Sequence, residues 1–158
     1  MGLITVNGIV TRYANYREND RILSIFTKEL GGISAASRGC RRPGGKLMGA
    51  SELFVFGEFV LFENKDKYTL DSCDVRETFY PLREDVARYA AGAYMLSLIE
   101  QCRGVECAEA LVSLLYHALS YTAYTDSAPV DMAVSFAAKL LSELGFTPAI
   151  TRCAGCGL

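Results

Sequence analysis

The chain has 158 residues, of which 51% are apolar and 22% are charged. This composition suits one ordinary domain, or two small ones that share a core, and it excludes a disordered chain and a collagen-like repeat. The longest uncharged stretch, residues 110–125, is shorter than the ~20 residues of a membrane span, and the N-terminus lacks the features of a signal peptide. We therefore expect a cytoplasmic protein with no membrane contact, whose six cysteines are reduced thiols.

The net charge of −2 is distributed unevenly. Residues 1–80 carry 11 Lys and Arg against 10 Asp and Glu, whereas residues 81–158 carry 5 against 8. A glycine-rich segment between Gly31 and Ser51 has four cations and no acid, which predicts a mobile cationic loop between two apolar runs. Its cations are Arg38, Arg41, Arg42 and Lys46.

The first half of the chain predicts β-strands separated by turn residues, at the spacing of an all-β barrel or sandwich. The fourth run has large apolar side chains on both faces, so one face can line a barrel and the second half of the chain can cover the other. The expected strands are residues 3–16, 21–27, 33–37, 52–63 and 67–75.

The second half predicts three helices. The first has Pro81 in its opening turn and continues to about Cys102. Its apolar stripe is Val86, Tyr89, Ala90, Ala93, Leu96 and Ile99. The second helix covers residues 107–124. Asp126 or Ser127 can cap the third helix, which ends at Gly145. Because no linker separates the halves, we expect the barrel and the helices to pack together.

The cationic loop suits a phosphate backbone, because Lys and Arg neutralise phosphates and release counterions. Neighbouring strands add further cations, and nearby tyrosines could stack on bases. The alternative is a solvated loop that keeps the protein soluble, with the aromatic rings in the core. The additional candidates are Arg12, Arg17, Arg21, Lys28, Tyr13 and Tyr16.

Cys153 and Cys156 have the spacing of two zinc ligands, although the same spacing serves thiol–disulfide exchange. Neither the other four cysteines nor the last two residues offer a second pair, so we expect half of a zinc site, and zinc as a cofactor only if further ligands are supplied. The redox alternative prefers a pair that follows a strand at a helix N-terminus. His117, the single histidine, is expected to be partly buried and structural.

Several separated blocks carry a family resemblance. They are residues 16–27 (YRENDRILSIFT), 33–43 (ISAASRGCRRP), 79–85 (FYPLRED) and 140–148 (LLSELGFTP), followed by the Cys-x-x-Cys-Gly ending. In this order they resemble the bacterial RecO family, the recombination mediators of DNA repair. The resemblance covers essentially the whole chain.

The resemblance implies an α+β fold: a five-stranded OB-fold barrel over residues 1–80, which binds DNA, packed against about three α-helices over residues 81–158. It implies binding of single- and double-stranded DNA, annealing of complementary strands, and loading of RecA onto DNA coated by SSB, with SSB and RecR as partners and no catalytic chemistry. The expected location is the cytoplasm, at the nucleoid.

By motif match, the resemblance makes Arg38, Arg41 and Arg42 the favoured DNA contacts. Arg17 and Arg21 follow only by analogy, and Arg21 could instead pair with Asp20 or Glu18 to fix a turn. Family members continue to a second cysteine pair and further helices, so we expect a truncated chain or a short gene product. The alternative function is an OB-fold interaction module that binds an acidic peptide without touching DNA.

Overall fold

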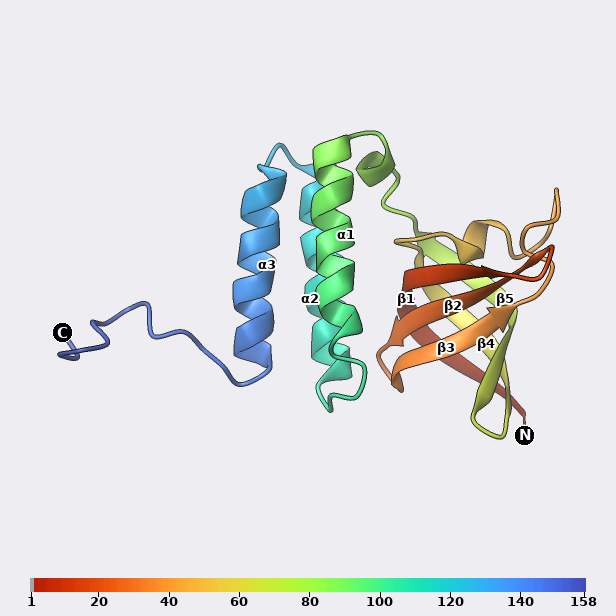
Figure 1. The fold of residues 1–158 in the computed structure, drawn as a ribbon, viewed down its shortest axis with the longest axis horizontal. Helices are drawn as coiled ribbons and strands as arrows, with labels where there is room; N and C mark the ends of the chain where they lie inside the picture. The colour runs from red at the N-terminus through yellow and green to blue at the C-terminus, as the bar shows by residue number, and fades with distance from the viewer. Residues whose placement is uncertain (1) are drawn as a thin grey trace.

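The computed structural model describes residues 2–158 as a closed barrel followed by a row of helices (Figure 1). A long C-terminal segment extends away from the last helix. The elements are β1 (Gly2–Tyr16), β2 (Asp20–Thr27), β3 (Gly31–Ser37), the 3₁₀ turn η1 (Gly49–Ser51), β4 (Phe56–Asn64), β5 (Lys67–Glu77), the 3₁₀ turn η2 (Tyr80–Arg83), α1 (Val86–Glu100), α2 (Ala108–Tyr124) and α3 (Pro129–Glu143).

The five strands close into a barrel in the order β1-β2-β3-β5-β4. All neighbours are antiparallel except β3 and β5, which pair in parallel through Ala35 and Ala36. Alternate side chains point inward, as the period of a β-strand requires. This arrangement confirms the predicted OB-fold within an α+β chain. The barrel interior consists of Val6, Val10, Leu23, Ile25, Ile33, Ala35, Val55, Phe59, Leu61 and Leu70.

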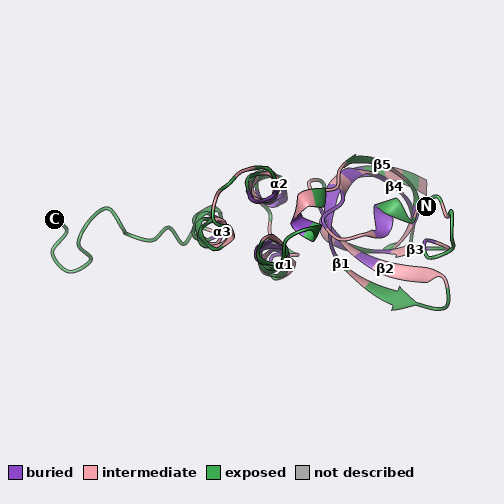
Figure 2. Ribbon diagram, turned by 90° about the horizontal axis from the view of Figure 1, so that it is seen from above, coloured by how far each residue is buried: buried purple, intermediate pink, exposed green. Residues whose placement is uncertain are grey.

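A second apolar cluster joins the barrel to the helices. Ile9 and Phe26 contribute to it from the strands, and Phe79 and Leu82 from the connection to α1. Viewed from above, α1 and α2 lie against the barrel and α3 lies beyond them (Figure 2). The outer wall of the barrel and the helices therefore share this second cluster, which is separate from the barrel interior. Within residues 2–158, no helix is long and apolar enough to cross a membrane.

The predicted strand over residues 52–63 begins later, at Phe56. Phe54 has a left-handed backbone with φ of 67°, and its buried ring meets Tyr89 of α1 edge-to-face at 5.7 Å. Val55 instead points into the barrel. Phe54 and Val55 therefore belong to different clusters, as the adjacent residues Ile9 and Val10 of β1 do. The predicted cover is only partial, because Phe62 on the outer face of β4 is 41% exposed.

Helix α1 also differs from its prediction. Pro81 belongs to the 3₁₀ turn η2, and α1 starts after Asp85, whose carboxylate accepts a hydrogen bond from the Arg88 backbone N–H. The predicted apolar stripe is wrong at Val86, Tyr89 and Ala90, which are exposed, and it omitted Met95, which is buried. Burial follows the barrel surface, and sequence periodicity alone does not reveal that surface.

Helix α3 has Ala128 as its N-cap, and neither Asp126 nor Ser127 caps it. Pro129 supplies the fixed φ of the first turn instead. Gly145, with φ of 91°, follows the C-terminal end as predicted. Only one face of α3 is packed, at Phe136 and Leu140.

Phe54→Ala should lower the free energy of unfolding by about 3–5 kcal/mol, because it opens a cavity between the barrel and α1. The matched control is Phe62→Ala, which removes the same atoms from a partly exposed ring and should cost less than about 1 kcal/mol. Urea denaturation followed by circular dichroism measures both. Equal destabilisation by the two substitutions would contradict the assigned role of Phe54.

Candidate nucleic-acid interface

Two connections meet at the end of the barrel opposite the helices (Figure 1). One is the β1–β2 turn, and the other is residues 38–48, which link β3 to η1 and are called the basic loop below. The Asp20 carboxylate accepts from the backbone N–H of Gly39 at 2.8 Å, and the N–H of Arg41 donates to the carbonyl of Asn19 at 3.0 Å. These bonds hold the two connections side by side.

The basic loop is folded into consecutive turns, although a mobile loop was predicted. The N–H of Gly45 donates to the carbonyl of Arg42 at 2.9 Å, and Gly44 has a φ of 73°, which glycine adopts without strain. Ser51, buried at η1, donates to the carbonyl of Leu47 at 2.7 Å. The loop therefore presents its cations from a defined backbone.

Arg38, Arg42 and Lys46 are exposed, and within residues 2–158 their side chains form no hydrogen bond or ion pair. Arg41 is also exposed and donates only to the backbone carbonyl of Glu18, at 3.2 Å. Arg17, on the adjoining turn, lies 5.2 Å from the ring centre of Tyr16. Five predicted cations and one predicted tyrosine thus gather at this end of the barrel.

A shallow hollow continues from the basic loop onto the outer face of β4 and β5. Its volume is about 340 Å³, and its lining joins Arg38 to Lys67 and the exposed ring of Phe62, with Asn64 and Thr69 between them. Exposed aromatic rings beside cations can stack on bases while phosphates are neutralised. Sequence reasoning missed Phe62 and Lys67. The available signal was a large apolar residue in the outward register of β4.

Arg21 is a structural cation. Its guanidinium donates to the Glu52 carboxylate and to the Ser51 carbonyl, both at 2.8 Å, and it lies 4.0 Å from the ring centre of Tyr13. The proposed pairing with Asp20 or Glu18 is therefore wrong. Arg21 fixes β2 to the segment after η1, and it covers one face of Tyr13.

The remaining predicted cations do not form one track. Arg12 lies where β1 faces α1, beside Leu96 and Ser97. Lys28 lies where the barrel faces α2, beside Tyr116 and His117. Arg12 is therefore on the α1 side of the junction between barrel and helices, and Lys28 is on the α2 side. Because Arg17 lies on the turn beside the basic loop, these three cations occupy three separate places.

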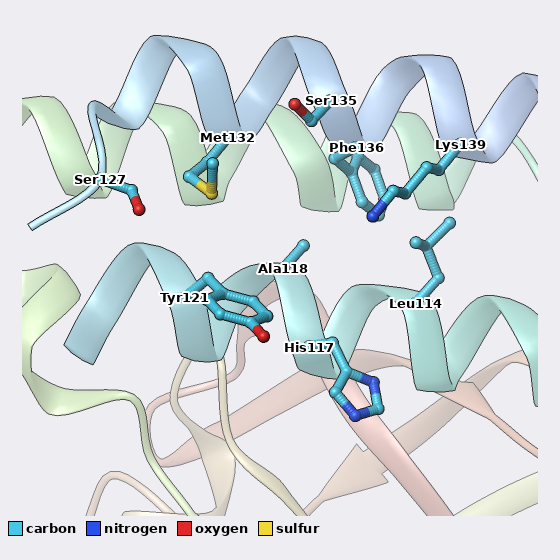
Figure 3. A pocket seen from close by; sticks show the side chains of 9 residues that line it. All are labelled: Leu114, His117, Ala118, Tyr121, Ser127, Met132, Ser135, Phe136 and Lys139. Carbon is cyan, nitrogen blue, oxygen red and sulfur yellow. The ribbon is translucent and has the colours of Figure 1, made fainter. Parts of the chain in front are cut away.

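His117 is exposed, whereas partial burial was predicted. Its Nδ1–H donates to the carbonyl of Ser113 at 2.7 Å, within α2. Next to it, α2 and α3 border a pocket of about 380 Å³ (Figure 3). Leu114, Met132 and Phe136 line this pocket, and Lys139 stands at its edge.

The two cysteines of the Cys-x-x-Cys pair are exposed in the C-terminal segment. Backbone N–H groups of Cys156 and Gly155 lower the pKa of the Cys153 thiol, which favours a ligating thiolate. Within residues 2–158, no cluster of three or more His, Cys, Asp or Glu could hold a metal. The pair supplies two ligands, so these residues do not fit a complete four-ligand zinc site.

Arg21→Ala should lower the free energy of unfolding by about 1.5–3 kcal/mol, because it leaves the Glu52 carboxylate and the Ser51 carbonyl without their donor. Arg42→Ala removes an exposed cation with no partner and should change stability by less than about 0.5 kcal/mol. Urea midpoints compare the two variants. If Arg21→Ala destabilises the protein no more than Arg42→Ala does, Arg21 is a free cation.

Alkylation should separate the cysteines by exposure. With iodoacetamide at about pH 8, Cys153 and Cys156 should react first, whereas Cys40 and Cys102 are buried and should be protected. Burial, followed by the charges of Asp74 and Glu58, raises the pKa of Cys73 to about 12, so it also stays unreactive. Peptide mass spectrometry measures the order. Early modification of Cys73 would contradict it.

Comparison with known proteins identifies the family of the chain. The family model for the recombination protein O N terminal matches residues 1–79, and the one for its C terminal matches residues 83–158. Curated relatives named DNA repair protein RecO are 37% identical over 158 residues in Acetivibrio thermocellus and 35% identical over 158 residues in Symbiobacterium thermophilum. Each alignment covers 99% of this chain, but only 63% and 62% of the respective relatives. The chain therefore belongs to the RecO family, as its sequence blocks predicted, and spans a little under two thirds of these relatives' length.

Proposed function

We propose that this chain binds DNA as part of a recombination mediator in DNA repair, and that it carries out no catalytic step. The observation that supports this proposal is the basic loop, where Arg38, Arg42 and Lys46 are exposed without partners among the described residues, beside a hollow with the exposed ring of Phe62. Cations that need no rearrangement to meet phosphates suit both single- and double-stranded DNA.

The chemistry at the basic loop would be electrostatic. Guanidinium and ammonium groups replace counterions condensed along the phosphates, and the release of those ions favours binding at low salt. Phe62 and Tyr16 offer rings on which bases of a single strand could stack. None of these contacts reads a base edge, so binding would not depend on sequence.

Annealing would follow from the same charges. Two complementary strands repel each other through their phosphates, and a protein that neutralises both lowers this barrier. In this proposal residues 1–80 provide the DNA surface. Residues 81–158, with a net charge of −3 from 5 cations and 8 acids, provide a helical buttress that is, taken as a whole, a poorer surface for DNA.

Partner binding would use the helical part. We propose SSB and RecR as partners in the cytoplasm at the nucleoid, with RecA loaded onto the DNA as a result. The α2–α3 pocket supports a protein contact there, because its apolar lining and Lys139 suit an acidic, partly apolar tail such as that of SSB. Zinc would enter only with ligands in addition to Cys153 and Cys156.

The salt dependence of DNA binding tests the proposal. Log affinity against log salt should flatten by about 2 in Arg38→Ala/Arg42→Ala/Lys46→Ala, because each phosphate of a single strand that the protein neutralises contributes about 0.7 to the slope. Fluorescence anisotropy of a labelled oligonucleotide across a salt series measures the slope.

Lys139→Ala/Arg152→Ala is the charge control, since both residues are exposed and lie on α3 and in the C-terminal segment. The control should keep the slope of the unmodified chain. If the triple variant also keeps it, the basic loop does not hold DNA. If the unmodified chain does not bind even at low salt, the proposed function of this chain is wrong.

A further inference from the structure

A groove follows the junction between the barrel and α1. It consists of two adjoining hollows of about 250 and 320 Å³ that share Leu53 as a lining residue. Figure 2 shows β1 beside α1 along this junction. This groove is called the seam groove below. None of its lining residues belongs to the basic loop.

One stripe of α1 forms a wall of the seam groove. Tyr89, Ala93, Ser97 and Gln101 recur at helical spacing along it. At about 1.5 Å per residue, the stripe from Tyr89 to Gln101 is about 18 Å long. Residues 11–13 of β1 form the opposite wall. A groove about 18 Å long suits an extended chain rather than a compact ligand.

Charge in the seam groove favours an anionic occupant. Its two acids are already neutralised, because Glu52 pairs with Arg21 at 2.8 Å and Glu100 pairs with Arg103 at 3.2 Å. Arg12 is exposed and, among the described residues, forms no ion pair or side-chain hydrogen bond.

Arg83 is the second free cation of the groove. Within the described part of the chain it donates only to the carbonyl of Leu53, at 2.7 Å, and the rest of its guanidinium faces solvent. With the acids paired, Arg12 and Arg83 give the groove a local charge of about +2, within a chain whose net charge is −2.

Aromatic rings lie between these cations. Tyr89 is 42% exposed, and its ring is held edge-to-face against buried Phe54. Tyr13 is partly exposed and is fixed by the Arg21 guanidinium over its face. Rings that are held rigidly lose little entropy when a base stacks on them, and such stacking contributes about 1–3 kcal/mol per base.

We propose that the seam groove is a second binding site for single-stranded nucleic acid, in which Arg12 and Arg83 neutralise phosphates and Tyr89 stacks on a base. The inference rests on the proposed function, since it gives this chain two separate strand sites. The basic loop would hold one strand and the seam groove the other. The two sites share no lining residue, since the seam groove is lined by Tyr13, Glu52 and residues of α1 rather than by the basic loop.

Stoichiometry with a short strand tests the proposal. A hexanucleotide of thymidine is too short to occupy both sites, so calorimetric titration of the full chain at low salt should give about two bound strands per chain. Arg12→Glu/Arg83→Glu should retain one, the triple basic-loop variant should retain one, and Arg152→Ala, in the C-terminal segment outside both sites, should retain both. Annealing of longer complementary strands, followed by energy transfer, should slow at least tenfold in the seam variant.

A second measurement needs no substitution. A strand that carries 5-iodouracil, irradiated on the native chain, should crosslink to the peptide that contains Tyr89, and Tyr89→Leu should abolish this crosslink while it retains the apolar contact with Phe54. If only one strand binds, and only the basic-loop variant loses it, the seam site is overturned and the proposed function stands. Crosslinks confined to residues 16–69 would have the same meaning. If the native chain binds no strand, both proposals fail.

Discussion

The buried contact between Phe54 and α1 is the constraint on which the rest of the structure depends. Just before β4 begins, the backbone of Phe54 and Val55 is hydrogen-bonded to Val10 of β1. Phe54 is left-handed there, and its ring enters the helical core while Val55 points into the barrel. Gly92 permits this approach, because a Cβ at that position would lie 2.9 Å from Cε1 of Phe54. The closeness of α1 to β1 brings the two walls of the seam groove together.

Two carboxylates hold the barrel to the helices. One oxygen of Glu77 accepts from the backbone N–H groups of Thr78 and Phe79 and from the Tyr124 hydroxyl, at 2.9, 2.7 and 2.6 Å. Burial, and then this bond, raises the pKa of Tyr124 to about 12. On the other side, Glu100 bonds to the Thr11 hydroxyl and pairs with Arg103. Acids of the junction are therefore engaged in the fold, while several arginines remain free for solvent or an anion.

Periodicity predicted five strands and three helices, because apolar residues repeat every second position in the strands and every third or fourth in the helices, whereas the OB-fold was implied by the family resemblance. It did not predict where β4 starts, since Phe54 and Val55 are equally apolar but serve different cores. The basic loop was readable from composition. The position of Arg12 was not, because it depends on strand register, and β1 has an irregularity between Val10 and Arg12 that changes which side chains face outward.

In the proposed function, the exposure of the free arginines would allow the paired strands to be released. A cation in water gains little from each phosphate, and salt screens that gain, so several weak contacts hold a strand without trapping it. Two such surfaces would bring two strands near each other while most of their bases stay free to pair. A duplex formed in this way is stiffer than either strand and could not follow both the basic loop and the seam groove. Base pairing would therefore displace the strands from the sites that brought them together.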